Sequence, residues 1–244
     1  MPEAEVEPTL AALLALVPEG LEEVDRDGDV ELAVYVDGAG ERRVRAVFPE
    51  AESWPVEPGW GDRWRAFHHA IVAGGLWIGP PWEEAPAGLD AVVVDPGRAF
   101  GTGAHPTTRA CIELLAREKR RGSVLDAGCG SGVLAVAAAR LGYAPVVAVD
   151  RDEVAVEVTR ATCRRNGVAV EARLADVLAD ALPSADLLVA NIELDVVERL
   201  LARTASPRAI TSGYTSGNRL RAPGWTLVDR LELDGWAADA WVRS

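Results

Sequence analysis

The stretch that decides the fold is Val124–Gly132, which reads Val-Leu-Asp-Ala-Gly-Cys-Gly-Ser-Gly, followed by Pro145–Asp150, which reads Pro-Val-Val-Ala-Val-Asp. A buried strand that ends in an acid, a glycine-rich loop, a helix and a second strand that ends in an acid are the parts of a βαβ unit. Such a unit binds a nucleotide-like ligand at the carboxyl ends of its strands. We therefore expect a ligand pocket beside Asp126 and Asp150.

The spacing of the glycines indicates which ligand this pocket takes. A dinucleotide-binding loop follows G-x-G-x-x-G, whereas the third glycine here, Gly132, comes one residue early. An acid at the first strand end suits a cationic amino group, and an acid at the second suits the two hydroxyls of a ribose. S-adenosylmethionine carries both groups. The residues predicted to bind it from this pattern are Asp126, Gly128, Gly130 and Asp150.

The chain from Leu89 onward alternates between strand and helix patterns, which predicts an α/β fold with a parallel sheet. The expected strands are 91–94, 124–126, 146–150, 170–174, 187–191 and 209–212. The expected helices are 107–119, 131–141, 153–166 and 195–204. Two further apolar runs, 226–233 and 238–242, flank Asp234-Gly235, a tight turn that predicts a closing antiparallel hairpin. This ending is typical of the seven-stranded, Rossmann-like sheet of class I methyltransferases.

The chain is expected to have three parts. Residues 1–52 are predicted to form a small acidic α+β domain with a helix over 9–17 and strands over 30–36 and 43–48, joined by a turn. Residues 53–85 hold five of the eight tryptophans together with several prolines, so we expect a linker there. Residues 86–244 are expected to form the large domain.

Charge is distributed unevenly along the chain. The net charge is −13, and residues 1–57 contain 15 acidic residues and 4 arginines. Repulsion of phosphates argues against nucleic acid as a direct ligand of this part, whereas a basic protein partner is allowed. The alternative is a solvated acidic surface that aids solubility. Residues 1–7 do not resemble a signal peptide, and the apolar stretch 10–17 is too short to span a bilayer. We expect a cytoplasmic monomer that does not bind membranes.

The cysteines and histidines predict no metal site. Cys111, Cys129 and Cys163 are odd in number and lack C-x-x-C spacing, which favours a reducing compartment and argues against a thiolate zinc site. His68 and His69 are adjacent, and the one other histidine of the sequence is distant. A third histidine ligand for a metal is therefore not indicated.

The segment 95–109 is dense in glycines and hydroxyl side chains and lies just before the core sheet. Loops of this kind cover ligands, because glycine lets the backbone approach closely and hydroxyls can donate beside a helix N-terminus. The residues of this loop predicted to contact the methyl donor are Phe100, Gly101, Thr102 and Thr107. The alternative is a structural crossover capped by Thr107.

The stretches 95–103, 105–108 and 124–132, together with Asn191, resemble the bacterial methyltransferases of ribosomal protein L-eleven. The resemblance runs from about Trp60 to the C-terminus. It implies an N-terminal substrate-recognition module and a class I methyltransferase domain that modifies lysine side-chain and N-terminal amines. The donor-site residues that it implies are Thr107, Gly128, Asp150 and Asn191.

Asn191, at the end of a predicted strand, is our candidate catalytic residue. We expect its amide or backbone oxygen to orient the amine while the residue also borders the donor. The alternative is an asparagine that caps a turn. Asn191 is not followed by Pro-Pro-Tyr or Pro-Pro-Phe, which disfavours methylation of bases or glutamine. Asp176 lies where related folds hold the adenine amino group, although a surface aspartate after a strand is the alternative there.

The sequence therefore predicts an S-adenosylmethionine-dependent protein N-methyltransferase that acts on amines of a basic ribosomal protein. A lysine methyltransferase of another protein, such as the β subunit of electron-transfer flavoprotein, is one alternative. A small-molecule N-methyltransferase and a donor-binding module without turnover are the others. After Asn191 this chain continues with Ile192-Glu193, and its stretch 212–215 matches the late Ser-Gly-Ile loop of the family only in part.

Overall fold

The computed structural model describes Thr9, Leu13, Leu16 and residues 22–26, 29–34, 36, 38–54, 69–95 and 103–244, with the backbone alone at 22–26 and 29–31. The chain divides into two compact units, residues 1–61 and 62–244. Each unit is described by itself.

The first unit combines a hairpin with a helix. Strands β1 (Glu22–Arg26) and β2 (Asp29–Ala33) pair antiparallel, and α2 (Gly38–Val47) follows. Leu13 and Val44 are the buried apolar residues of its small core. The described residues of the predicted first helix, 9–17, are helical. This unit thus combines α and β elements.

The predicted strand at 43–48 is wrong, because α2 covers most of it. Gly40 and Val44, one helical turn apart, are the buried residues of this segment, and Glu41 pairs with Arg45 across another turn at 3.2 Å. A four-residue spacing places both pairs on single helix faces. Arginine and alanine also favour helix over strand.

The second unit begins with a small sheet in described residues 69–95. Strand β4 (Leu76–Gly79) lies between β3 (Ile71–Ala73), which is antiparallel to it, and β5 (Asp90–Val93), which is parallel. Two of these strands lie within 53–85, where a linker is predicted. They are short and are flanked by tryptophan and proline, so periodicity does not reveal them. The rest of the expected linker lies mostly outside the described residues.

Two side chains attach this small sheet to neighbouring helices. Asn166 receives a hydrogen bond from the backbone N–H of Val93 and donates one to the carbonyl of Val93, both at 2.8 Å. Asn166 therefore pairs with the edge of β5 as a neighbouring strand would. The carboxylate of Glu113 accepts a hydrogen bond from the backbone N–H of Gly74 at 2.7 Å.

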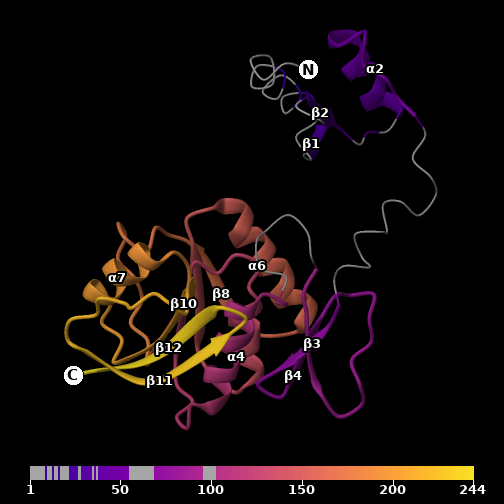
Figure 1. Cartoon of the computed structure of the whole chain (residues 1–244). Helices are drawn as coiled ribbons and strands as arrows, with labels where there is room; N and C mark the ends of the chain where they lie inside the picture. The colour runs from indigo at the N-terminus through magenta and orange to yellow at the C-terminus, as the bar shows by residue number, and fades with distance from the viewer. Residues whose placement is uncertain are drawn as a thin grey trace. The chain divides into compact units, whose positions relative to one another are not determined.

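Residues 103–244 contain a seven-stranded sheet in the order β11-β12-β10-β9-β6-β7-β8. Its strands are β6 (Val124–Ala127), β7 (Val146–Asp150), β8 (Val170–Leu174), β9 (Leu187–Asn191), β10 (Arg208–Thr215), β11 (Trp225–Leu233) and β12 (Trp236–Arg243). The strands from β10 to β8 run parallel. At the other end, β12 is antiparallel to both β10 and β11, and Figure 1 shows β11 and β12 as the two yellow arrows.

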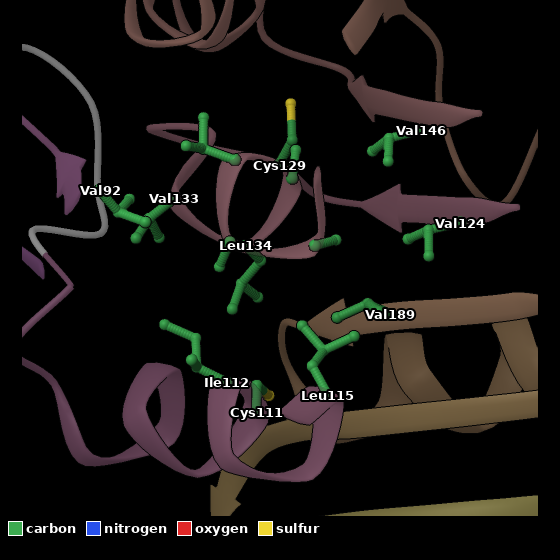
Figure 2. Close-up of a cluster of buried hydrophobic side chains, with 14 of the residues drawn as sticks. Val92, Cys111, Ile112, Leu115, Val124, Cys129, Val133, Leu134, Val146 and Val189 are labelled. Atoms are coloured by element: carbon green, nitrogen blue, oxygen red, sulfur yellow. The ribbon is translucent and has the colours of Figure 1, made fainter. Parts of the chain in front are cut away.

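Four helices described in this unit cover the two faces of the sheet. They are α4 (Pro106–Arg117), α5 (Val133–Arg140), α6 (Glu153–Asn166) and α7 (Leu194–Arg203). Helices α4, α5 and α6 share one apolar cluster with the sheet, whereas α7 belongs to the cluster on the other face. Figure 2 shows the first cluster, where Ile112 and Leu115 of α4 face Leu134 of α5 and Val189 of β9.

The predicted fold class is confirmed. The βαβ unit, the parallel strands and the closing hairpin at Asp234-Gly235 form as the sequence indicates. The parallel strands bury both faces, since neighbouring residues such as Leu187 and Leu188 enter opposite clusters, as expected for a sheet covered on two sides. Within the described residues, no helix is long and apolar enough to cross a membrane.

Replacing Asn166 by alanine should lower the free energy of unfolding by about 2–3 kcal/mol, because it leaves two backbone groups of Val93 without partners in a partly buried place. Urea unfolding monitored by circular dichroism measures the change. Thr226→Ala on exposed β11 serves as the control and should shift stability by no more than about 0.5 kcal/mol. Equal effects of the two substitutions would contradict the proposed attachment.

Candidate functional site

The candidate site lies at the carboxyl ends of β6, β7 and β9. Strand β6 pairs with β7 on one side and with β9 on the other, so the order of strands reverses at β6. In open parallel sheets the crevice outside such a reversal is the usual ligand site. Asp126 and the loop after it, Asp150 and Asn191 all come from these three strand ends.

The glycine-rich loop after β6 is fixed by hydrogen bonds to β7. The backbone N–H groups of Gly128 and Cys129 both donate to the carbonyl of Val149, at 2.8 and 3.0 Å. The N–H of Gly130 donates to the carboxylate of Asp150 at 3.0 Å. The sequence prediction that these glycines and Asp150 meet at one place is therefore matched by their positions.

Gly128 is required by a close approach. A Cβ atom at this position would lie 2.4 Å from Cγ2 of Ile192, and the backbone there has φ +76°. The loop after β6 and the residue after β9 thus pack directly on each other. Sequence reasoning assigned Ile192 no role in the site, because nothing along the chain shows which residue faces the loop.

Asp126 is a buried acid that makes no hydrogen bond within the part of the chain that the structure describes. Its side chain is 1% exposed, and among the described residues neither carboxylate oxygen has a hydrogen-bond partner. Burial raises the pKa of this carboxyl to about 7; the backbone N–H of Ala135, which faces it outside hydrogen-bond geometry, opposes the rise in part, and the nearby charge of Asp150 adds to it. Removing a charge from water without a compensating group is costly, so this place favours either a proton or a cationic ligand.

Asp150 presents two oriented oxygens at the end of β7. One accepts from the N–H of Gly130 and the other from the N–H of Asp152, each at 3.0 Å. Each carboxylate oxygen can accept more than one hydrogen bond. The side chain is therefore held in place while it keeps capacity for a pair of hydroxyl donors.

The N-terminus of α4 meets the end of β9. Asn191 donates from Nδ2 to the hydroxyl oxygen of Thr108 at 3.3 Å. Thr107 is buried, and its hydroxyl lies 2.7 Å from Nδ1 of His105, the N-cap residue of the helix. The ring of His105 contacts the ring of Trp236 edge to face, with centroids 4.8 Å apart.

The sequence analysis does not predict that His105 and Trp236 lie beside the carboxyl ends of these strands. The signal that could have found them is the partnership of α4 with the final hairpin, which depends on tertiary packing and not on spacing along the chain.

Asp176 lies just after β8, next to Asp150 along the edge, because the N–H of Ala175 donates to the carbonyl of Asp150 at 2.8 Å. One carboxylate oxygen of Asp176 accepts from the N–H of Leu178 at 2.7 Å. That bond caps a local turn, and the residue is half-buried. Phe100, Gly101 and Thr102, also predicted to contact the donor, lie outside the described residues.

Sheet order, antiparallel closing hairpin and the pair of acids around a glycine-rich loop define a class I methyltransferase domain. Residues 50–217 match the family model described as "Ribosomal protein L11 methyltransferase (PrmA)". A ribosomal protein L11 methyltransferase of Symbiobacterium thermophilum is 39% identical over 231 residues, which cover 86% of this chain and 76% of the relative. One of an Exiguobacterium species is 40% identical and covers 75% of this chain and 64% of the relative.

Among solved structures, the crystal structure of a ribosomal protein L11 methylase from Lactobacillus delbrueckii subsp. bulgaricus is similar. It has a TM-score of 0.64 and 27% identity, and the match covers 72% of this chain and 99% of that one. The chain described here belongs to the ribosomal protein L11 methyltransferase family.

The buried acid predicts a pH-dependent stability. An unfolded aspartate loses its proton near pH 4, whereas Asp126 in the folded chain loses it at about 7. Between these values the folded state holds a proton that the unfolded state has lost, so the stability that this group contributes falls as the pH rises. Asp126→Asn, which carries no charge, removes this fall.

The melting temperature of Asp126→Asn minus that of wild type should be at least about 3 °C higher at about pH 8 than at about pH 5. Differential scanning calorimetry at the two pH values measures it. The control is Asp186→Asn, because hydrogen bonds from Ser123 lower the pKa of Asp186 and its effect should be the same at both pH values. If the melting temperatures of both variants, each relative to wild type, change equally between the two pH values, the raised pKa of Asp126 is refuted.

Proposed function

We propose that this chain is an S-adenosylmethionine-dependent protein N-methyltransferase that methylates lysine side-chain or N-terminal amines of ribosomal protein L11. The observation that supports it most is the buried carboxylate of Asp126, which lacks a partner among the described residues and lies at the strand reversal of a chain of this family. A cationic amino group is the ligand chemistry that compensates such a charge.

The residues present fit the proposed donor. Asp126 would hold its amino group and the two oriented oxygens of Asp150 would hold the ribose hydroxyls. Glycine at 128 and 130, where φ is +76° and +52°, lets the loop turn sharply beside the proposed ligand. The other residues proposed for this site, on the strength of the family resemblance and the loop composition, are Phe100, Gly101, Thr102, Thr107, Asp176 and Asn191.

When bound, S-adenosylmethionine supplies a methyl group that is already activated by the positive sulfur. The work left to the protein is to align a neutral amine with that methyl group and to exclude water. Asn191 is suited to the first task, because its Nδ2 is held by Thr108 at 3.3 Å and its amide oxygen can accept a hydrogen bond from the amine. A lysine with an ordinary pKa of about 10.4 must first lose a proton, which burial of the amine favours.

The proposed protein substrate agrees with the charge of the chain. Residues 1–57 carry most of the net charge of −13, and an acidic module attracts a basic partner over distances of about a Debye length. We propose the first unit, residues 1–61, as the substrate-recognition part and the second unit, residues 62–244, as the methyltransferase domain.

Transfer of a labelled methyl group tests the proposal. The full chain is incubated with methyl-labelled S-adenosylmethionine and, in separate reactions, purified ribosomal protein L11, electron-transfer flavoprotein and a panel of small amines. Label on L11 at lysine or N-terminal amines, located by mass spectrometry, is the expected result. Label on the flavoprotein or on a small amine instead would replace the substrate, and donor binding without transfer would identify a non-catalytic module.

Asn191→Ala should lower kcat with L11 by about tenfold to a hundredfold, because the amine loses its orienting group, while the Kd of the donor changes by less than about threefold. Single-turnover kinetics and isothermal titration calorimetry measure the two quantities. Thr226→Ala is the control and should match wild type in both. Wild-type turnover in Asn191→Ala would exclude the catalytic role.

A further inference from the structure

The end of β10 carries a bulge beside the candidate site. The pairing of β10 with β12 shifts between Ser212 and Tyr214, and Gly213 lies at the shift with φ +103°. An extra residue in a strand moves the following side chain to the opposite face of the sheet. Tyr214 consequently lies on the same face as Thr211 and Asp239.

The hydroxyl of Tyr214 is held in a buried network on that face. It lies 3.0 Å from a carboxylate oxygen of Asp239 and 2.8 Å from the hydroxyl of Thr211. The indole N–H of Trp241 donates to the same threonine hydroxyl at 2.9 Å. Asp239 is fully buried, so this carboxylate needs the hydrogen bonds that it receives.

Arg230 completes the network and extends it to the chain after β10. Its Nη1 contacts both carboxylate oxygens of Asp239, at 3.1 and 3.0 Å. Its Nη2 donates to the carbonyls of Ser216 and Asn218, at 2.8 and 3.2 Å. The arginine therefore joins the buried acid to the turn that follows the bulge.

The bulge rests on the segment that follows β9. A Cβ atom at Gly213 would lie 2.1 Å from the carbonyl oxygen of Ile192, and the N–H of Ile192 donates to the carbonyl of Ser212 at 3.2 Å. The side chain of Ile192 packs on Gly128 of the glycine-rich loop after β6. Ile192 is thus enclosed between the bulge and the loop, and Asn191 directly precedes it.

A purely structural reading is that the network only stabilises the sheet. Buried ion pairs, however, often contribute no more stability than apolar residues of similar volume. This one lies at the sheet edge that carries Asn191, and it fixes a strand irregularity that contacts the neighbouring residue. Irregularities of this kind re-aim side chains next to active sites.

We propose that Tyr214, held by Asp239 and Arg230, is a positioning residue for the methyl transfer. It holds the Gly213 bulge against Ile192 and so fixes Asn191 relative to the glycine-rich loop after β6. The inference rests on the proposed function for its kinetic part. Its structural part, the control of the segment after β9 by the tyrosine hydroxyl, stands on the contacts alone.

Tyr214→Phe tests it, with Tyr143→Phe as the matched control. Tyr143 is also a buried tyrosine, but its hydroxyl donates to the carbonyl of Leu115 at 2.9 Å, away from the site. Both variants should lose similar stability in urea. Tyr214→Phe alone should lower kcat by about tenfold or more, as expected for a misplaced catalytic group, while the Kd of S-adenosylmethionine stays within about twofold.

Hydrogen exchange gives a readout that needs no turnover. Mass spectrometry of a peptide covering 187–197 should show at least about threefold faster exchange in Tyr214→Phe than in wild type, because the N–H of Ile192 loses its fixed acceptor. Tyr143→Phe should leave this peptide unchanged. Asp239→Asn should reproduce the pattern of Tyr214→Phe, and if that variant fails to fold, the tyrosine pair still decides the question.

The outcomes separate this inference from the proposed function. Unchanged exchange at 187–197, or equal kcat in the two tyrosine variants, would overturn the positioning role. If wild type fails to methylate L11, the proposed function fails, and exchange at 187–197 alone then supports or overturns the control of this segment by Tyr214.

Discussion

The pairing of β6 with both β7 and β9 is the constraint on which the site depends. The chain runs from β6 to β7 and β8 on one side and then crosses from β8 to β9 on the other side of β6, so the carboxyl end of β6 opens between two sets of connecting chain. Three strand ends thereby bring Asp126, Asp150 and Asn191 to one edge, although the first and last are far apart in sequence. The apolar clusters on both faces hold these strands in register, so the core positions the polar edge.

The site keeps a buried acid at a cost in stability. Asp126 of β6 is 1% exposed, and burial raises its pKa to about 7. Asp239, in the same sheet, is equally buried but pairs with Arg230. The contrast separates two states of a buried carboxylate: Asp239 is hydrogen-bonded and paired with a charge, whereas Asp126 makes no hydrogen bond within the described residues. Groups with perturbed pKa values and no internal partner are typical of functional sites.

Most of the large domain follows from the sequence, because its signals are local. The alternating glycines after Asp126, the regular return of apolar runs and the Asp234-Gly235 turn each predict an element that forms. The segment 43–48 was misread, since a short run of valine, alanine and arginine suits either helix or strand, and burial of Gly40 and Val44 on one face decides for helix. The strands at 71–79 are too short to show a period.

The site was predictable only in part for a related reason. Acids and glycines at strand ends are visible in sequence, whereas His105, Ile192 and Trp236 enter through contacts between distant segments. Those contacts have a further consequence. Since no side chain separates Gly128 from Ile192 or Ile192 from Gly213, the three positions form one steric unit. A mutation that enlarges any of them should survive during divergence only with a compensating change at another, so correlated substitution here would record the geometry of the edge.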